Sequence, residues 1–193
     1  MLKQVLNRIY SDFLMPSRLD EYENLLRLAI EFQYHICSIE QFWSIHKTNK
    51  HNNNSRYLIL RHDIDTNVST AKKMFGVEKE LNVNASYYFR LSTIDIPFMQ
   101  QINRAGSEAS YHYEEIATYA KQHKIREPNK IYSNMTEIRK MFSKNLKTLR
   151  DLTNIPMEIV ASHGDFVNRY LKITNNEILK DPEFRIKNNI KLE

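Results

Sequence analysis

Two aspartates, Asp63 and Asp65, lie at the end of the apolar run Tyr57–Leu60, within the sequence Arg-His-Asp-Ile-Asp. If the extended geometry of that run persists, residues two apart point to the same side, so both carboxylates face one space. Two carboxylates that close do not both ionise comfortably unless a cation or a proton lies between them. A metal ion is the simplest solution, with one Asp as ligand and the other as a base. The alternative is that the pair only caps a helix and adds surface charge.

Two later segments also place polar side chains at expected strand ends. A strand over residues 108–114 would align Ser110, His112 and Glu114 on one face. His163 belongs to a polar His-Gly-Asp sequence that follows another apolar stretch. A lone buried His is usually structural, but a His at the same end of a parallel sheet as an acidic pair is a better candidate for a ligand.

Arg90 is a further candidate, because it follows the β-type run of residues 83–89. Its position at the end of an expected strand is the same as that of the acidic pair. It could contact a substrate, pair with a carboxylate of the site, or form only a surface salt bridge. The sequence alone leaves all three options open.

The elements that would position these residues alternate between strands and helices. Four consecutive apolar residues predict a strand that is buried on both faces, as in a parallel sheet. We expect neighbouring strands at Tyr57–Arg61, Ala85–Phe89, Glu108–Tyr111 and Glu158–Ser162, with a weaker strand at Tyr34–Ser38. Because the carboxyl ends of parallel strands meet at one edge, the polar segments should open on the same side.

Helices are expected between these strands. Thr66 or Asn67 can cap the helix after the acidic pair. Other helices are expected at residues 20–33, 39–45, 97–105, 116–124 and from residue 135 to about 152, with loops at 47–55 and 125–133. Asn134 and Glu137 form a capping-box pattern before the last of these helices. Asn82 and Gly106 are expected to end helices with a left-handed backbone.

Composition limits the class of protein. A length of 193 residues suits one domain over residues 1–193, and 41% apolar with 26% charged residues is ordinary for a soluble protein. A single cysteine fits a reducing compartment. The first 15 residues lack a signal-peptide pattern and no later stretch is long enough to span a membrane, so we predict a cytoplasmic protein without a membrane partner.

The formal net charge of +5 is placed unevenly. Residues 121–193 hold 15 basic against 9 acidic residues, whereas residues 1–120 hold 13 against 14. A basic face can bind nucleic acid, but no motif of interleaved aromatic and basic residues accompanies it. Solvated helix faces explain the surplus better, so no nucleic-acid partner is expected.

Three segments, in this order, resemble the NodB-like polysaccharide deacetylases: Arg-His-Asp-Ile-Asp, Ala-Ser-Tyr-Tyr-Phe-Arg and Gly-Ser-Glu-Ala-Ser-Tyr-His-Tyr-Glu-Glu. The likeness is greatest to a branch with a His-Asp-x-Asp first motif and a Tyr-His-Tyr-Glu second motif, and it covers roughly residues 20–175. The resemblance implies a distorted (β/α) barrel and a divalent metal, usually zinc. It also implies a substrate that is an N-acetylated sugar or saccharide, from which the acetyl group is removed.

The resemblance also implies roles for individual residues. Asp63 matches the general base, Asp65 the metal-binding Asp and His112 the first metal-binding His. Ile116 stands where the family pattern has a second His, and Ser-His-Gly-Asp replaces an Arg-Pro-Pro-Tyr motif. His163 is therefore the candidate third ligand, with Glu114 as its substitute. Arg90 and Glu114 are also assigned to substrate binding.

The implied chemistry is metal-assisted amide hydrolysis, in which the cation activates a water and Asp63 removes its proton. The family's general acid is a His on a late strand, and no matching segment follows residue 175. We therefore expect an incomplete barrel, a native chain that continues past Glu193, and weak activity of these 193 residues. The alternative is a catalytically degenerate domain of the same fold that binds a saccharide or a partner.

Overall fold

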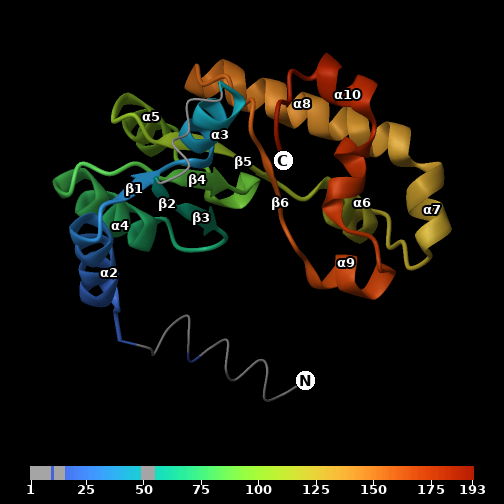
Figure 1. Ribbon diagram of the computed structural model, residues 1–193. Helices are drawn as coiled ribbons and strands as arrows, with labels where there is room; N and C mark the ends of the chain where they lie inside the picture. The colour runs from blue at the N-terminus through green and yellow to red at the C-terminus, as the bar shows by residue number, and fades with distance from the viewer. Residues whose placement is uncertain (1–9, 11–15, 49–54) are drawn as a thin grey trace.

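A computed structural model describes residue 10, residues 16–48 and residues 55–193 (Figure 1). The strands are β1 (Tyr34–Cys37), β2 (Arg56–Ile59), β3 (Arg61–Ile64), β4 (Ser86–Phe89), β5 (Glu108–Tyr113) and β6 (Ala161–Ser162). The longer helices are α2 (Leu19–Glu31), α3 (Ile39–Lys47), α4 (Val68–Glu80), α5 (Ile96–Arg104), α6 (Glu115–Gln122) and α8 (Met135–Thr153). The shorter ones are η2 (Leu91–Thr93), α7 (Pro128–Ser133), α9 (Phe166–Leu171), η3 (Asn175–Lys180) and α10 (Pro182–Lys187). The predicted alternation of strands and helices is confirmed.

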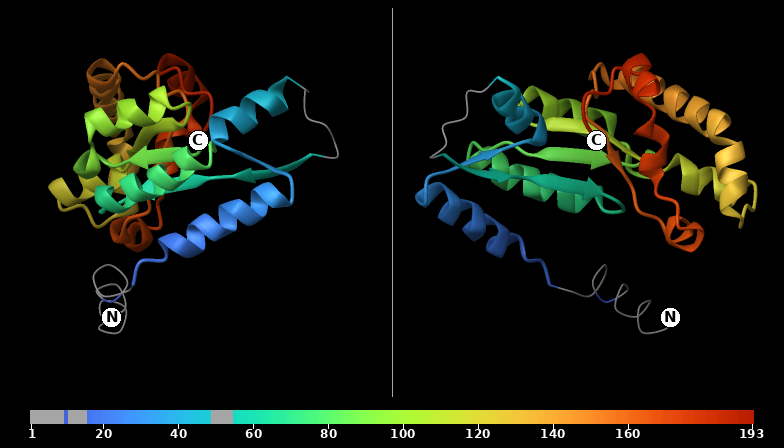
Figure 2. Two further views of the ribbon diagram at one scale, coloured as in Figure 1. Left: turned by 90° about the vertical axis from the view of Figure 1, so that its left-hand side faces the viewer. Right: turned by 45° about the vertical axis from the view of Figure 1, so that its right-hand side comes forward.

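All pairs of neighbouring strands are parallel. β1 pairs with β2, and β3, β4, β5 and β6 form a four-stranded sheet in that order. Leu60 joins the two sheets, because its N–H donates to the carbonyl of Cys37 (3.0 Å) and its carbonyl accepts from the N–H of Ser86 (2.9 Å). Residues 56–64 therefore act as one bent strand that belongs to both sheets. The result is a curled parallel sheet that forms a half-barrel (Figure 2).

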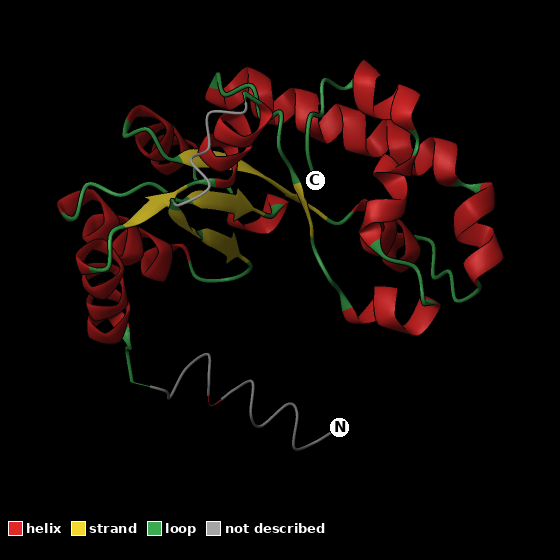
Figure 3. Ribbon diagram, in the orientation of Figure 1, coloured by secondary structure: helices red, strands yellow, loops and turns green. Residues whose placement is uncertain are grey.

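The far side of the half-barrel is extended by the C-terminal residues. Leu192 makes an isolated parallel bridge with Ile159, directly before β6, and its carbonyl accepts from the N–H of Val160. Figure 3 shows the C-terminus beside the strand that contains β6. The sheet therefore keeps its parallel pattern beyond the four strands that carry the polar segments.

The predicted strands are confirmed as parallel neighbours, with shifted boundaries. The strand predicted at Tyr57–Arg61 was wrong in its limits, since it runs on to Ile64 and bends at Leu60. Its predicted burial on both faces was also wrong: Ile59 is 40% exposed, because β2 lies beside the edge strand β1. The loop predicted at residues 125–133 contains helix α7, and most of the predicted loop at residues 47–55 lies outside the described residues.

The outer face of the curled sheet packs against helices. Side chains alternate along a strand, so β4 and β5 turn two aromatic residues each to this face. Tyr87 makes an edge-to-face contact with Phe75 of α4 at 6.2 Å, and Tyr113 makes one with Phe142 of α8 at 5.0 Å. Both tyrosines are fully buried. Burying each such ring stabilises the fold by roughly 1.5–3 kcal/mol, so this aromatic layer fixes the sheet on its helices.

The concave face carries polar side chains, which satisfy one another. Glu108 is buried and accepts from the hydroxyls of Ser86 (2.6 Å) and Tyr88 (2.9 Å) and from the N–H of Glu40 (3.1 Å). Burial raises the pKa of Glu108, and these hydrogen bonds oppose the rise. The same face continues toward His112, so the polar lining leads to the carboxyl ends of the strands.

Several helix ends follow the sequence prediction, and one does not. The side chain of Asn67 caps α4 by accepting from the N–H of Thr70 (3.0 Å), and Asn82 and Gly106 have φ values of 53° and 86°. The predicted capping box at Asn134 was wrong. Its Oδ1 accepts from the hydroxyl of Tyr119 (3.1 Å) and its Nδ2 donates to the carbonyl of Lys130 (2.7 Å), so the side chain is already committed.

Candidate metal centre

The carboxyl ends of β3, β5 and β6 bring three possible ligands together. Asp65 follows β3, His112 lies near the end of β5, and His163 follows β6. Their Asp65 Oδ1, His112 Nε2 and His163 Nδ1 atoms form one group that could hold a metal ion. Parallel pairing causes this convergence, since residues about fifty positions apart reach the same edge of the sheet.

The spacing of the three ligand atoms suits a tetrahedral ion. The distances are 3.6 Å from Asp65 Oδ1 to His112 Nε2, 3.1 Å from Asp65 Oδ1 to His163 Nδ1, and 3.2 Å between the two ring nitrogens. Zinc bonds of about 2.0–2.1 Å to nitrogen and oxygen place tetrahedral ligands roughly 3.3 Å apart. The observed separations lie on both sides of that value. Three protein ligands would leave a fourth position for water or substrate.

The imidazole of His112 is oriented for ligation. It is 2% exposed, and its Nδ1 lies 3.1 Å from the carbonyl of Ala161, to which it donates. Nδ1 therefore carries the proton and Nε2 presents its lone pair to the group, an arrangement common for metal-binding His. Burial lowers the pKa of His112, although the nearby carboxylates oppose this. The neutral form that a ligand requires is thus favoured.

Asp65 provides independent support for a cation. Although 41% of its side chain is exposed, its Oδ1 is buried and accepts no hydrogen bond from the described residues, even with His163 Nδ1 only 3.1 Å away. A buried polar atom without a partner costs about 1–3 kcal/mol. The backbone of Asp65 is held by its own N–H, which donates to the carbonyl of Asp63 (3.1 Å). A cation in the group would satisfy the oxygen that the protein leaves unpaired.

Asp63 lies at the edge of this group. Its Oδ2 is 3.7 Å from His112 Nε2, so both aspartates face the same space, as the sequence predicts. Arg61 binds both of its oxygens, with 2.8 Å from Nε to Oδ1 and 3.0 Å from Nη2 to Oδ2. Each carboxylate oxygen has a further lone pair, so Asp63 can still accept a proton while it is paired. This role for Arg61 was not anticipated, although it stands two residues before Asp63.

Arg90 pairs with a carboxylate, which is one of the three options that the sequence leaves open. Its guanidinium pairs with Glu114, at 3.0 Å from Nε to Oε1 and 2.8 Å from Nη2 to Oε2, and its Nη1 lies 3.3 Å from the carbonyl of Asp65. Both partners are largely buried, so the pair is part of the wall of the site. The role of Arg90 and Glu114 in substrate binding stays a prediction.

A second group of possible ligands consists of Glu114, His163 and Asp165. Both of its carboxylates already have cationic partners, because Glu114 binds Arg90 and Asp165 binds Lys121 (2.5 Å). Asp165 also caps α9 by accepting from the N–H of Val167 (2.8 Å). The first group is therefore the better metal site, since its Asp65 Oδ1 is the oxygen without a partner.

The residue that holds His163 in place was missed by sequence reasoning. Asn175 of η3 is buried, and its Nδ2 donates to the carbonyl of His163 (2.6 Å) while its Oδ1 accepts from the N–H of Ile116 (3.0 Å). It thereby connects the loop after β6 to the first turn of α6. Asn175 follows the strands by many residues and belongs to no recognisable motif, so no sequence signal marks it.

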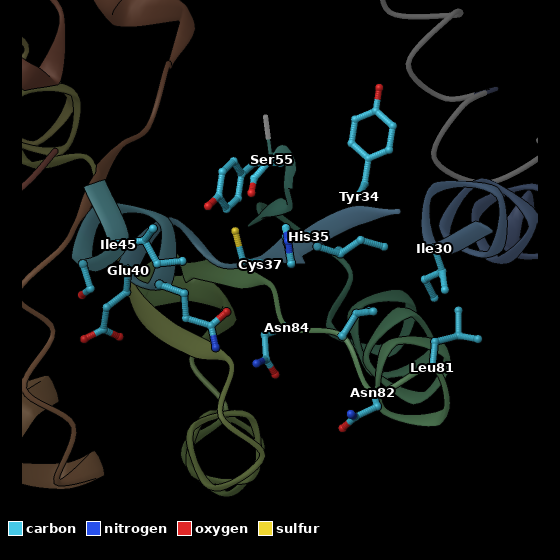
Figure 4. A pocket seen from close by; sticks show the side chains of 15 residues that line it. Ile30, Tyr34, His35, Cys37, Glu40, Ile45, Ser55, Leu81, Asn82 and Asn84 are labelled. Atoms are coloured by element: carbon cyan, nitrogen blue, oxygen red, sulfur yellow. The ribbon is translucent and has the colours of Figure 1, made fainter. Parts of the chain in front are cut away.

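A large cavity lies elsewhere in the described chain. It measures about 1040 Å³ and is shown in Figure 4, lined among others by Tyr34 and His35 at the start of β1 and by Asn84 before β4. These residues lie at the amino ends of the strands, whereas the ligand groups lie at the carboxyl ends. None of the residues that line the cavity belongs to either ligand group.

In comparisons with known proteins, the chain matches no protein-family model, no curated protein and no solved structure. The likeness of its motifs to a deacetylase family therefore stays an interpretation of the sequence. None of the helices in residues 16–48 and 55–193 is both long and apolar enough to cross a bilayer. The function has to be argued from the geometry of the ligand group and its neighbours.

Proposed function

We propose that this protein is a zinc-dependent hydrolase that removes the acetyl group from an N-acetylated sugar, within a NodB-type barrel. One observation carries the proposal: Asp65, His112 and His163 present three ligand atoms at tetrahedral spacing, with a second carboxylate, that of Asp63, beside them. A hydrolytic metal site needs such an incomplete ligand set and a nearby base. The sequence motifs supply the expectation of an acetamido sugar.

Each residue of the site would have a separate task. A divalent ion held by Asp65, His112 and His163 would polarise an amide carbonyl and lower the pKa of a bound water. Asp63, whose Oδ2 faces the same space, would accept a proton from that water, and Arg61 would hold its carboxylate in place. The carbonyl of Ala161 would keep His112 in the tautomer that presents Nε2.

Protonation of the leaving amine limits the expected rate. Both histidines of the group would serve as ligands, so neither is free to act as a general acid. Asp63 is then the residue placed to return the proton that it accepted. General acid assistance typically accelerates a reaction about 10²–10⁴-fold. We therefore expect a turnover number lower by about this factor than that of a comparable site with a dedicated acid.

The alternative is a domain that binds a saccharide or a partner without catalysis. Two observations favour it: Arg61 engages both oxygens of Asp63, and Ile116 stands where the family pattern has a ligand. In that case zinc could still bind, but Asp63, engaged by Arg61 on both oxygens, would not act as a base. The two candidates therefore differ in hydrolysis and not in metal content.

The test combines metal content with hydrolysis of N-acetylglucosamine oligomers. Asp65→Asn and His163→Ala should each lose zinc, whereas Asp63→Asn should keep zinc and lose hydrolysis. Asp151→Asn and His123→Ala are matched controls at exposed positions outside both ligand groups, and they should change neither property. Zinc retained by both ligand variants would refute the site, and a zinc-loaded wild type without any hydrolysis would favour the binding domain.

A further inference from the structure

A second hollow is lined by residues of α6, of the loop after it and of α9. Its volume is about 400 Å³, which is within the range of small-molecule sites. Its apolar lining consists of Ala120, Ile125, Phe166, Val167 and Tyr170. This α6–α9 hollow is the cavity nearest to His163 in sequence, because α9 begins three residues after that ligand.

Two aromatic rings are exposed at the hollow. Phe166 is 68% and Tyr170 is 65% exposed, and residues four apart lie on the same face of a helix. Exposed rings contribute little to the stability of a short helix. Adjacent exposed apolar groups beside a hollow are typical of a binding surface.

The rim of the hollow is positively charged. Lys121, Lys124 and Arg126 line it, and no acidic residue does. Lys121 pairs with Asp165, but the side chains of Lys124 and Arg126 form no hydrogen bond or ion pair with any described residue. Two unpaired cations beside apolar walls attract an anionic ligand.

Lys121 lies between the hollow and Asp165, which follows His163 by two residues. Its Nζ lies 5.4 Å from the ring centre of Phe166 and 2.5 Å from Asp165, whose carboxylate belongs to the second group around His163. Three residues of chain span at most about 11 Å. The Cα atoms of His163 and Phe166 are therefore separated by no more than this length, which one extended small molecule can bridge.

We infer that the α6–α9 hollow binds the nucleoside diphosphate part of a nucleotide-activated, N-acetylated sugar. The base stacks on Phe166 and Tyr170, Lys124 and Arg126 bind the diphosphate, and the acetamido group reaches the metal site. This assignment rests on the proposed function and names its substrate class. A nucleoside diphosphate fits better than an acidic saccharide, because it supplies both a flat ring for two aromatic side chains and several charges for two cations.

The binding test uses uridine diphosphate and adenosine diphosphate with the metal-free protein, followed by calorimetry. Phe166→Ala and Tyr170→Ala should each weaken binding about 5- to 20-fold, at the lower end of what stacking contributes. The double variant Lys124→Ala with Arg126→Ala should weaken it further and reduce its dependence on salt. Tyr132→Ala and Lys144→Ala remove an exposed ring and an exposed cation outside the hollow, and they should bind as the wild type does.

Separate outcomes decide the inference and the proposed function. His163→Ala should lose zinc and keep nucleotide binding, which would show that the two sites are independent. No binding of either nucleotide at millimolar concentration, or equal binding by Tyr170→Ala and the wild type, would overturn the inference and leave the metal site untouched. An acidic oligosaccharide that binds in place of the nucleotides and depends on Lys124 and Arg126 would also overturn it. Zinc-dependent hydrolysis of N-acetylglucosamine oligomers would still support the proposed function in each of these cases.

Discussion

Replacing Asp65 with Asn should change stability in opposite directions with and without zinc. In the metal-free protein, Oδ1 of Asp65 is buried without a hydrogen-bond donor among the described residues, and His112 Nε2 lies 3.6 Å from it. The variant Asp65→Asn removes the negative charge from this buried position, where no donor among the described residues compensates it. Relief of an unpaired buried atom should stabilise the metal-free fold by about 1 kcal/mol.

The same substitution should weaken the zinc-loaded protein. An ion at 100 times its dissociation constant stabilises the wild type by about 2.7 kcal/mol. A change of 1 kcal/mol shifts the melting temperature of a domain this size by about 2–4 °C. Zinc should therefore raise the melting temperature of the wild type by about 5–10 °C, and that of the variant by much less. Without metal, the variant should melt about 2–4 °C above the wild type.

Thermal melting followed by circular dichroism, with chelator and with zinc, measures both effects. Asp151→Asn is the control, because Asp151 forms an exposed ion pair with Lys147 on α8 and such pairs contribute little. It should respond to zinc as the wild type does. A lower melting temperature of metal-free Asp65→Asn would refute the argument about the unpaired oxygen. An unchanged zinc response in that variant would refute its role as a ligand.

Three further predictions concern the residues around the site. Burial raises the pKa of Glu115, whose Oε2 has no partner among the described residues, so the native state binds its proton more tightly than the unfolded state. The free energy of unfolding that this proton contributes is fully present below the unfolded pKa and is lost as the pH rises above about 4.5. The wild type should therefore lose stability between pH 5 and 8, and Glu115→Gln should lose less, as measured by urea denaturation. Arg90→Ala should lower the free energy of unfolding by about 3 kcal/mol, because it leaves the carboxylate of Glu114 unpaired. A double variant that also replaces Glu114 should recover part of this loss, which a double-mutant cycle measures. Asn175→Ala should weaken zinc binding about tenfold in calorimetric titrations, because the carbonyl of His163 loses its partner, while unchanged zinc affinity would show that the loop holds itself.

The sequence predicts the ligand group well because strand geometry is regular. Asp65, His112 and His163 each follow or end an apolar run, and parallel strands that start in register finish at one edge. The same regularity predicts that Asp63 and Asp65 face one space. No knowledge of the packing was needed for either prediction.

The features that the sequence did not predict depend on contacts between distant segments. The bend at Leu60 arises because one strand pairs with β1 before that residue and with β4 after it. Asn134 has the right type for a helix cap, yet its amide is taken by Tyr119 and Lys130. Local propensity cannot show that a side chain has a better partner elsewhere.

Ile116 stands where the resembled family pattern has a second His, and its surroundings in α6 are apolar. Ile116 is fully buried in the first turn of α6, so a side chain at this position points into the apolar core and away from the ligand group. Its N–H is held by Asn175, and the other end of the same amide holds the carbonyl of His163. One buried side chain, Asn175, therefore holds the backbone at Ile116 and at His163 together. The loop that carries the proposed third ligand is thus fixed to the first turn of α6.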